Sequence, residues 1–191
     1  SGVSSPISSN SGSGIIAYDG AHHIRIVNNI AHGDPGGGIG SVGADYLHIE
    51  GNTIYDTSYG SEYGNSAISL FRLANADAAP GYHNIIRGNL LYFNRQTRPT
   101  IGVGQITDGN CIIIDTSRQT QGGTPSYTGS TLIENNVCFN NGGRGIHIFR
   151  SDNVDVFHNT LYQNAQTDSL DDGGSELSAI YSGNVRFRAT I

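Results

Sequence analysis

Lysine and methionine are absent from this 191-residue sequence, and all ten of its basic residues are arginines. Charged residues make up 14% of the chain, well below the usual quarter, and the net charge is −6. An acidic chain lacks the basic face that binds nucleic acid, so we expect no nucleic-acid partner. Because even an initiator methionine is missing, the sequence indicates a processed chain or a fragment.

Long apolar runs are also missing. No stretch approaches the roughly 18 apolar residues of a membrane span, so we expect no membrane insertion. The only two cysteines, Cys111 and Cys138, are too few for a disulfide framework. Both fall at small or apolar positions and are interpreted as buried packing residues, which leaves a disulfide between them open.

Glycine, in contrast, is abundant, with 27 residues. Apolar and aromatic residues recur throughout, which argues against disorder. Together these features favour many short strands joined by tight turns.

An asparagine-centred motif recurs along the chain at intervals of 23, 37, 47 and 23 residues. Its copies are IVNNIAH at Asn29, IEGNTIY at Asn52, IRGNLLY at Asn89, IENNVCF at Asn136 and VFHNTLY at Asn159. In the short units an alternating apolar run begins 13 residues before the asparagine, at Ile16, Ile39 and Ile146. Each unit therefore predicts three short strands separated by turns, which is one rung of a parallel β-solenoid.

Two columns of the motif support this interpretation. An apolar column contains Ala31, Ile54, Leu91, Cys138 and Leu161, and a ring column contains His32, Tyr55, Tyr92, Phe139 and Tyr162. Stacking at the strand spacing of about 4.8 Å explains why such residues repeat. It also predicts an asparagine ladder, in which each amide bonds to the asparagines above and below.

On these motifs the chain resembles the right-handed parallel β-helix superfamily, the fold of pectate lyases and related polysaccharide-active proteins. The resemblance implies an all-β, single-stranded helix of about six rungs over residues 15–191, preceded by a flexible segment, 1–14. Thr190 stands where the last rung should carry its asparagine. We expect an uncapped end there, and hence a fragment.

Insertions mark the third and fourth units. Six and 13 extra residues precede their first strands, and eight and 11 follow them. Loops on both sides of one sheet predict a two-walled groove over it. The alternative is that these loops are neutral surface insertions.

Alternation identifies the groove floor. With Ile146 and Ile148 inward, His147 and Phe149 face outward, and in the first rung Ala17 and Asp19 do the same. The predicted catalytic residues are His147, Arg144, Arg150 and Asp115; the predicted substrate-binding residues are Arg72, Phe71, Phe149, Asn110, Arg118 and Tyr63. A weaker prediction places Ca²⁺ at Asp108 and Asp115.

The resemblance implies a polysaccharide partner, and most directly a lyase that eliminates across a uronate. Lyases of the family use lysine or arginine as base and often Ca²⁺ to neutralise the carboxylate. Without lysine, the base candidates are Arg72, Arg144, Arg150 and His147. An arginine base demands a strongly lowered pKa, whereas histidine titrates near neutrality.

Two other functions remain open. A glycoside hydrolase needs a carboxyl pair, for which Asp108 with Asp115 or Glu62 with Asp115 are candidates. A non-catalytic carbohydrate-binding or structural β-helix needs neither. The acidic loop with Asp168, Asp171, Asp172 and Glu176 is interpreted as a solvated surface rather than a second calcium site. We expect a secreted or cell-surface monomer.

Overall fold

The computed structural model describes residues 12–118 and 125–190 of the chain. These residues form seventeen strands and no helix. None of them therefore belongs to a helix long and apolar enough to cross a membrane. The predicted flexible segment 1–14 lies outside the described residues except for 12–14, where the Gly14 amide donates to the Gly37 carbonyl at 3.0 Å.

The strands form three sheets in which all pairings are parallel. Sheet A contains β1 (Ile15–Tyr18), β4 (Ile39–Val42), β7 (Ile68–Phe71), β10 (Ile112–Asp115), β13 (Ile146–Phe149) and β16 (Leu177–Ile180). Sheet B contains β2 (His22–Val27), β5 (Asp45–Glu50), β8 (Tyr82–Arg87), β11 (Ser130–Glu134), β14 (Asp152–Phe157) and β17 (Gly183–Arg188). Sheet C contains β3 (Ile30–His32), β6 (Thr53–Tyr55), β9 (Leu90–Tyr92), β12 (Val137–Phe139) and β15 (Thr160–Tyr162).

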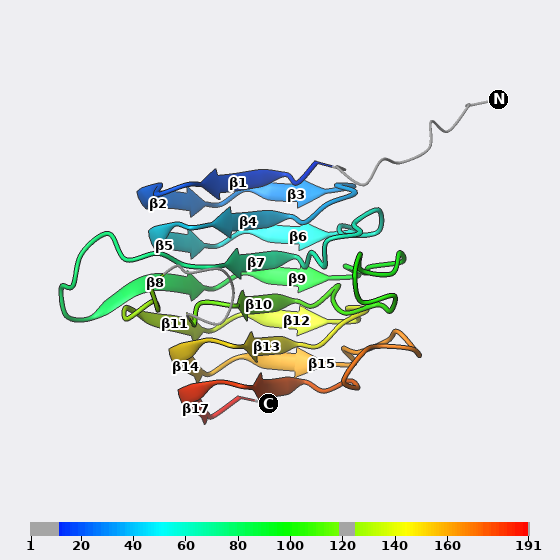
Figure 1. Cartoon of the computed structure of the whole chain (residues 1–191). Coiled ribbons are helices and arrows are strands. Elements are labelled where there is room, and N and C mark those ends of the chain that lie inside the picture. The colour runs from blue at the N-terminus through cyan, green and yellow to red at the C-terminus, as the bar shows by residue number, and fades with distance from the viewer. Residues whose placement is uncertain (1–11, 119–124, 191) are drawn as a thin grey trace.

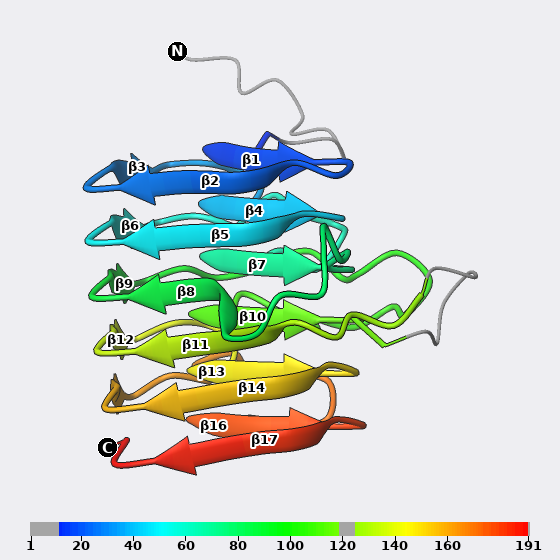
Figure 2. The ribbon, with the colours of Figure 1, turned by 90° about the vertical axis from the view of Figure 1, so that its left-hand side faces the viewer.

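Each rung passes from sheet A through sheet B to sheet C before the next rung begins below it (Figure 1). A quarter turn brings sheet B to the front, with its strands stacked in chain order (Figure 2). The predicted all-β parallel β-helix of about six rungs is confirmed; the described part of the sixth rung contains β16 and β17.

The core follows the predicted columns. Sheet A contributes fully buried isoleucines from four successive rungs, at positions 39, 68, 112 and 146. The apolar column of sheet C is buried as well, at 0–7% exposure. Outside it, the rings of His32, Tyr55, Tyr92 and Phe139 stack with centroids 4.9–5.1 Å apart. This spacing matches the strand separation, which confirms the stacking prediction for these four rings.

The asparagine ladder is also confirmed. From Asn29 to Asn136, each asparagine Nδ2 donates to the Oδ1 of the next one in the ladder at 2.8–3.0 Å, ending on Asn159. A second ladder, absent from the sequence-based predictions, joins Asn94, Asn141 and Asn164 in the same way. It ends at Glu176, whose carboxylate accepts from Asn164 at 2.6 Å. Glu176 thus has a structural partner rather than a purely solvated position.

Cys111 and Cys138 are fully buried, as predicted, and they form a disulfide. Cys111 directly precedes β10, and Cys138 lies in β12 of the same rung. The bond crosses the core and links sheet A to sheet C.

The first rung departs from the predicted register by one residue. Ile15, not Ile16, pairs with Ile39, so Ala17 points inward and is 8% exposed. Ile16 and Tyr18 point outward instead, with 40% and 55% exposure. The cause is the turn after β1, which has three residues where the next rung has two between β4 and β5.

The insertions leave sheet A at both of its edges, but only one set builds a wall. Loops 56–67, 93–111 and 163–176 project at the edge facing sheet C (Figure 1). The described parts of loops 72–81 and 116–129 fold over sheet B instead. There the Asp45 carboxylate accepts from the Ala76 amide at 2.8 Å and from the Tyr127 hydroxyl at 2.6 Å. The described parts of these loops therefore do not build the predicted second wall, because they bind to a buried carboxylate of sheet B.

Candidate functional site

A groove runs over the outer face of sheet A as two adjoining depressions. The upper depression has a volume of about 690 Å³ and the lower one about 410 Å³, both typical of ligand sites. The two depressions share five lining residues: Tyr63, Gly64, Phe71, Ile113 and Asp115. Asp115 therefore lies where the two halves of the groove meet.

The wall of the groove is held together by contacts between its loops. Glu62 accepts from Arg98 Nη1 at 3.1 Å, and the Glu62 carbonyl accepts from the Ile101 amide at 2.9 Å. Lower down, the Asp171 amide donates to the Ile106 carbonyl at 2.8 Å. Loops from three rungs thus form one continuous wall beside the sheet.

Asp108 is the most constrained carboxyl group of the groove. It is 8% exposed, and its two oxygens accept from Thr107 Oγ1 at 2.6 Å and from Asn110 Nδ2 at 2.8 Å. Gly109 lies between Asp108 and Asn110 at a φ of 79°, with its backbone packed on Gln96. Burial, and next the charge of Asp115, raise the pKa of Asp108 to about 7. Asp108 is therefore a carboxyl group that loses its proton only around neutral pH.

Asp115 ends β10 and faces the groove as predicted, half-buried, in the lining of both depressions. Burial raises its pKa, while a hydrogen bond from Thr116 Oγ1 at 2.6 Å and the charges of Arg150 and Arg72 oppose that rise. The Asp115 charge is itself one cause of the raised pKa of Asp108, so the titrations of the two carboxyl groups are linked. The pair thus offers a candidate acid in Asp108 and a candidate base or nucleophile in Asp115.

His147 and Arg144 lie in the lower depression, and both side chains are buried. The His147 Nδ1 contacts Ser178 Oγ at 2.6 Å. Burial and the Arg144 charge lower the pKa of His147 to about 3, so the imidazole is neutral at neutral pH. The Arg144 guanidinium donates to the carbonyls of Thr107 and Asp171, and burial lowers its pKa.

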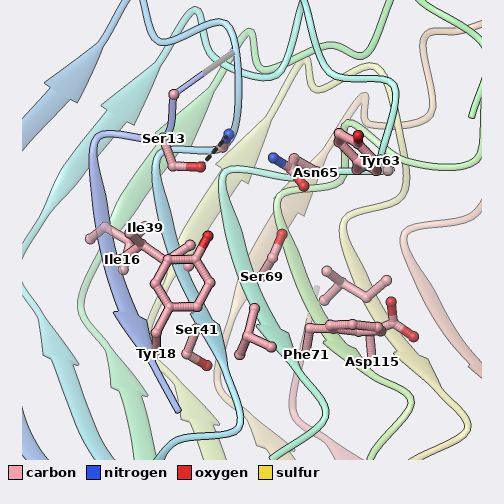
Figure 3. Close-up of a pocket in the computed structure, with 16 residues that line it drawn as sticks. Ser13, Ile16, Tyr18, Ile39, Ser41, Tyr63, Asn65, Ser69, Phe71 and Asp115 are labelled. Carbon is pink, nitrogen blue, oxygen red and sulfur yellow. Dashed lines mark hydrogen bonds between the residues drawn. The ribbon is translucent and has the colours of Figure 1, made fainter. Parts of the chain in front are cut away.

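Aromatic rings line the groove at several heights. Figure 3 shows Tyr18 at one end of the upper depression and Phe71 with Asp115 at the other, with Ser69 between them. Tyr63 projects from the wall with 58% exposure, and Phe149 lines the lower depression. Among the residues predicted to bind substrate, the structure therefore brings Phe71, Phe149 and Tyr63 to the groove.

Four other predicted residues lie outside both linings. Arg72 and Arg150 cover ring faces, with their Cζ atoms 4.6 Å from the Phe71 centroid and 5.0 Å from the Phe149 centroid. Arg118 pairs with Asp152 at 2.6 Å, at the turn toward sheet B. Asn110 is fully buried behind Asp108 and supports it.

The sequence-based site also misses residues that line the groove. Ile16 and Tyr18 escape it because of the register error in the first rung. Ile101, Val103 and the Asp171–Asp172 pair come from loops that carry no repeat. For Ile16 and Tyr18 the sequence did contain a signal. The Asp19–Ala21 turn has one extra residue, which shifts the inward and outward alternation of β1.

Calcium lacks a ready set of ligands here. Among the described residues, no three histidine, cysteine or acidic side chains converge to hold a metal. Both Asp108 oxygens already accept hydrogen bonds from protein groups. The donor set does not fit a calcium ion, and no step below depends on one.

Comparison with known proteins adds one finding. Residues 3–186 match the family model described as "Right handed beta helix region". No curated protein and no solved structure matches the chain. The match agrees with the strand order and confirms the predicted right-handed sense of the helix.

Proposed function

Because the chain belongs to the right-handed β-helix family and has a groove over its sheet A, we propose that this groove binds a polysaccharide and hydrolyses a glycosidic bond. The observation that supports this most is the carboxyl pair Asp108 and Asp115. Burial raises the pKa of Asp108 to about 7, and Asp115 lies where two ligand-sized depressions meet.

The chemistry needs an acid and a base or nucleophile at the scissile bond. Asp108 donates its proton to the glycosidic oxygen as the bond from that oxygen to the anomeric carbon breaks. The Asp115 carboxylate either attacks the anomeric carbon or takes a proton from the attacking water. In the first case, Asp108 takes a proton from the water that releases the sugar from Asp115, which reprotonates Asp108. In the second case, Asp115 loses its new proton to solvent and Asp108 regains one from solvent.

The floor supplies the surfaces that sugars use. Aromatic rings stack on the apolar faces of sugar rings, and Tyr18, Tyr63 and Phe71 lie along the upper depression. Between them Ser41, Ser69 and Asn65 offer hydroxyl and amide groups for sugar hydroxyls. A chain lying along this half places its next linkage near Asp115.

Elimination on a uronate is the second candidate, supported by the neutral His147 beside the Arg144 guanidinium. The imidazole would take the proton next to the carboxylate, and the guanidinium would bind that carboxylate. However, a pKa of about 3 makes His147 a weak base. Arg144 also already donates to two carbonyls.

Incubation with a polysaccharide panel tests these candidates. Hydrolysis gives new reducing ends without ultraviolet absorbance. Asp108→Asn or Asp115→Asn should lower the rate of hydrolysis by at least about a hundredfold. Glu134→Gln on sheet B, a matched carboxyl-to-amide change outside the groove, keeps full activity. If the products absorb in the ultraviolet, and His147→Ala abolishes their formation, the reaction is elimination rather than hydrolysis.

Binding without turnover would reduce the proposal to a carbohydrate-binding module. If no polysaccharide binds, the proposal is wrong.

We also propose that the protein acts outside the cell or at its surface, as a monomer. The buried Cys111–Cys138 disulfide supports this location, because such bonds persist in oxidising compartments. Detection of the native protein in the cytosol alone would contradict it.

A further inference from the structure

We propose that the groove selects an uncharged polysaccharide and discriminates against polyuronates. This inference rests on the proposed function, and it names the substrate class of that same site. It also opposes the sequence-based expectation of a uronate. The charges of the two depressions carry the argument.

The lower depression has an excess of acidic groups. Five carboxyl side chains line it, against a single guanidinium: Glu62, Asp108, Asp115, Asp171 and Asp172, with Arg144. Glu62 is paired with Arg98, and the pKa of Asp108 is raised to about 7, which leaves Asp115, Asp171 and Asp172 beside one lining cation. A uronate carboxylate placed here meets like charges, and such juxtapositions disfavour binding strongly.

The cations near this region are already engaged. Arg144 donates to the carbonyls of Thr107 and Asp171, and Arg98 pairs with Glu62 at 3.1 Å. Arg72 and Arg150 line neither depression and lie over ring faces of Phe71 and Phe149. The arginines that could bind the carboxylates of a polyuronate thus already make contacts within the protein.

The upper depression contributes no compensating charge. Among the described residues that line it, Asp115 carries the only ionisable carboxyl group, and the remaining polar side chains are serines, tyrosines and Asn65. Hydroxyl and amide groups beside aromatic rings suit the hydroxyls and apolar faces of neutral sugars. Both halves of the groove therefore favour a chain without carboxylates.

Oligosaccharide binding in an inactive background tests the inference. Asp108→Asn suits this purpose, because it replaces the candidate acid with a neutral amide. Neutral gluco-, xylo-, manno- and galacto-oligosaccharides are compared with oligogalacturonate and oligomannuronate by calorimetry at low salt. We expect at least one neutral series to bind, and both uronates to bind about tenfold more weakly or worse.

A charge-removal variant identifies the cause. Adding Asp171→Asn with Asp172→Asn should strengthen uronate binding several-fold and weaken its dependence on salt. Asp168→Asn, an exposed acid of the same loop that lines neither depression, is the matched control and should change nothing.

The outcomes separate the two proposals. Uronates that bind as tightly as neutral sugars would overturn the substrate class while leaving the polysaccharide groove intact. Uronate binding that is indifferent to the Asp171 and Asp172 changes would overturn the electrostatic selection. If neither class binds, the proposed function fails, and this inference fails with it.

Discussion

At the residue scale, environment rather than residue type decides what each groove side chain offers. His147 was predicted as a group titrating near neutrality, but burial beside Arg144 lowers its pKa to about 3. Asp108 was predicted as a weak metal ligand and as one member of a candidate carboxyl pair, and burial raises its pKa to about 7. Sequence identifies both residues as groove candidates, because alternation and loop position are sequence properties. It does not give their charge, because desolvation depends on three loops closing around them.

The first prediction concerns the effect of Asp108 on stability. Its folded pKa lies above the usual value of 3.8, so between about pH 4 and 7 the unfolded chain loses a proton that the native protein keeps. Native stability therefore falls with rising pH through this window and is level above it, apart from other groups. We expect Asp108→Asn to raise Tm by a few degrees at pH 8, and the gain to vanish below pH 4.

Thermal melts of wild type and Asp108→Asn across this pH range measure the effect. Asp152→Asn, which removes a half-exposed carboxylate paired with Arg118, is the control and should not stabilise at pH 8. A Tm for Asp108→Asn that is lower than wild type at every pH would show that Asp108 is ionised or that its hydrogen bonds dominate.

At the element scale, the repeat motif predicts strands and ladders well, and it predicts loops poorly. The asparagine spacing gives sheet C and the ladder, because each rung must repeat the same contact at the same height. The second ladder through Asn94 and Asn141 was missed, since its members follow the ring column outside the motif. The register of β1 failed for a similar reason: one extra turn residue inverts the alternation that Ile16 and Tyr18 follow.

The second prediction tests the asparagine ladder. Asn136 is fully buried, and its side chain accepts from the Asn89 amide and Nδ2 and donates to Ile86 and Asn159. Asn136→Ala leaves buried donors and acceptors without partners. Each costs about 1–3 kcal/mol, so we expect a loss of about 3 kcal/mol or more in the free energy of unfolding.

Asn29→Ala is the matched change at the ladder end. Its side chain is half-buried and only donates, so we expect a smaller loss of about 1 kcal/mol. Urea unfolding of both variants gives the comparison. Equal losses of unfolding free energy at the two positions would mean that burial within the ladder adds nothing to stability.

At the scale of the whole molecule, the fold follows from repetition, and the groove follows from departures from it. Stacked rungs leave sheet A as a flat outer face, and a flat face has no pocket of its own. The loops that interrupt the repeat supply the wall, and residues such as Ile101 and Asp171 enter the site only through them. Sequence could count these insertions but could not tell that loop 72–81 folds toward Asp45 of sheet B.

The last prediction concerns the disulfide that joins two sheets within the fourth rung. Cys111 and Cys138 are 27 residues apart, and closing a loop of that length in the unfolded chain stabilises a fold by about 3 kcal/mol. Replacing both with alanine should lower the free energy of unfolding by at least this amount, since the buried sulfurs also fill the core. Because neighbouring rungs support each other, we expect the lost stability to appear as one cooperative transition at a lower urea concentration.

Urea unfolding with and without reductant tests this prediction. Reductant should shift the unfolding midpoint of the wild type toward that of the double variant and leave the variant itself unchanged. A wild type that is indifferent to reductant throughout unfolding would show that the bond contributes nothing to stability.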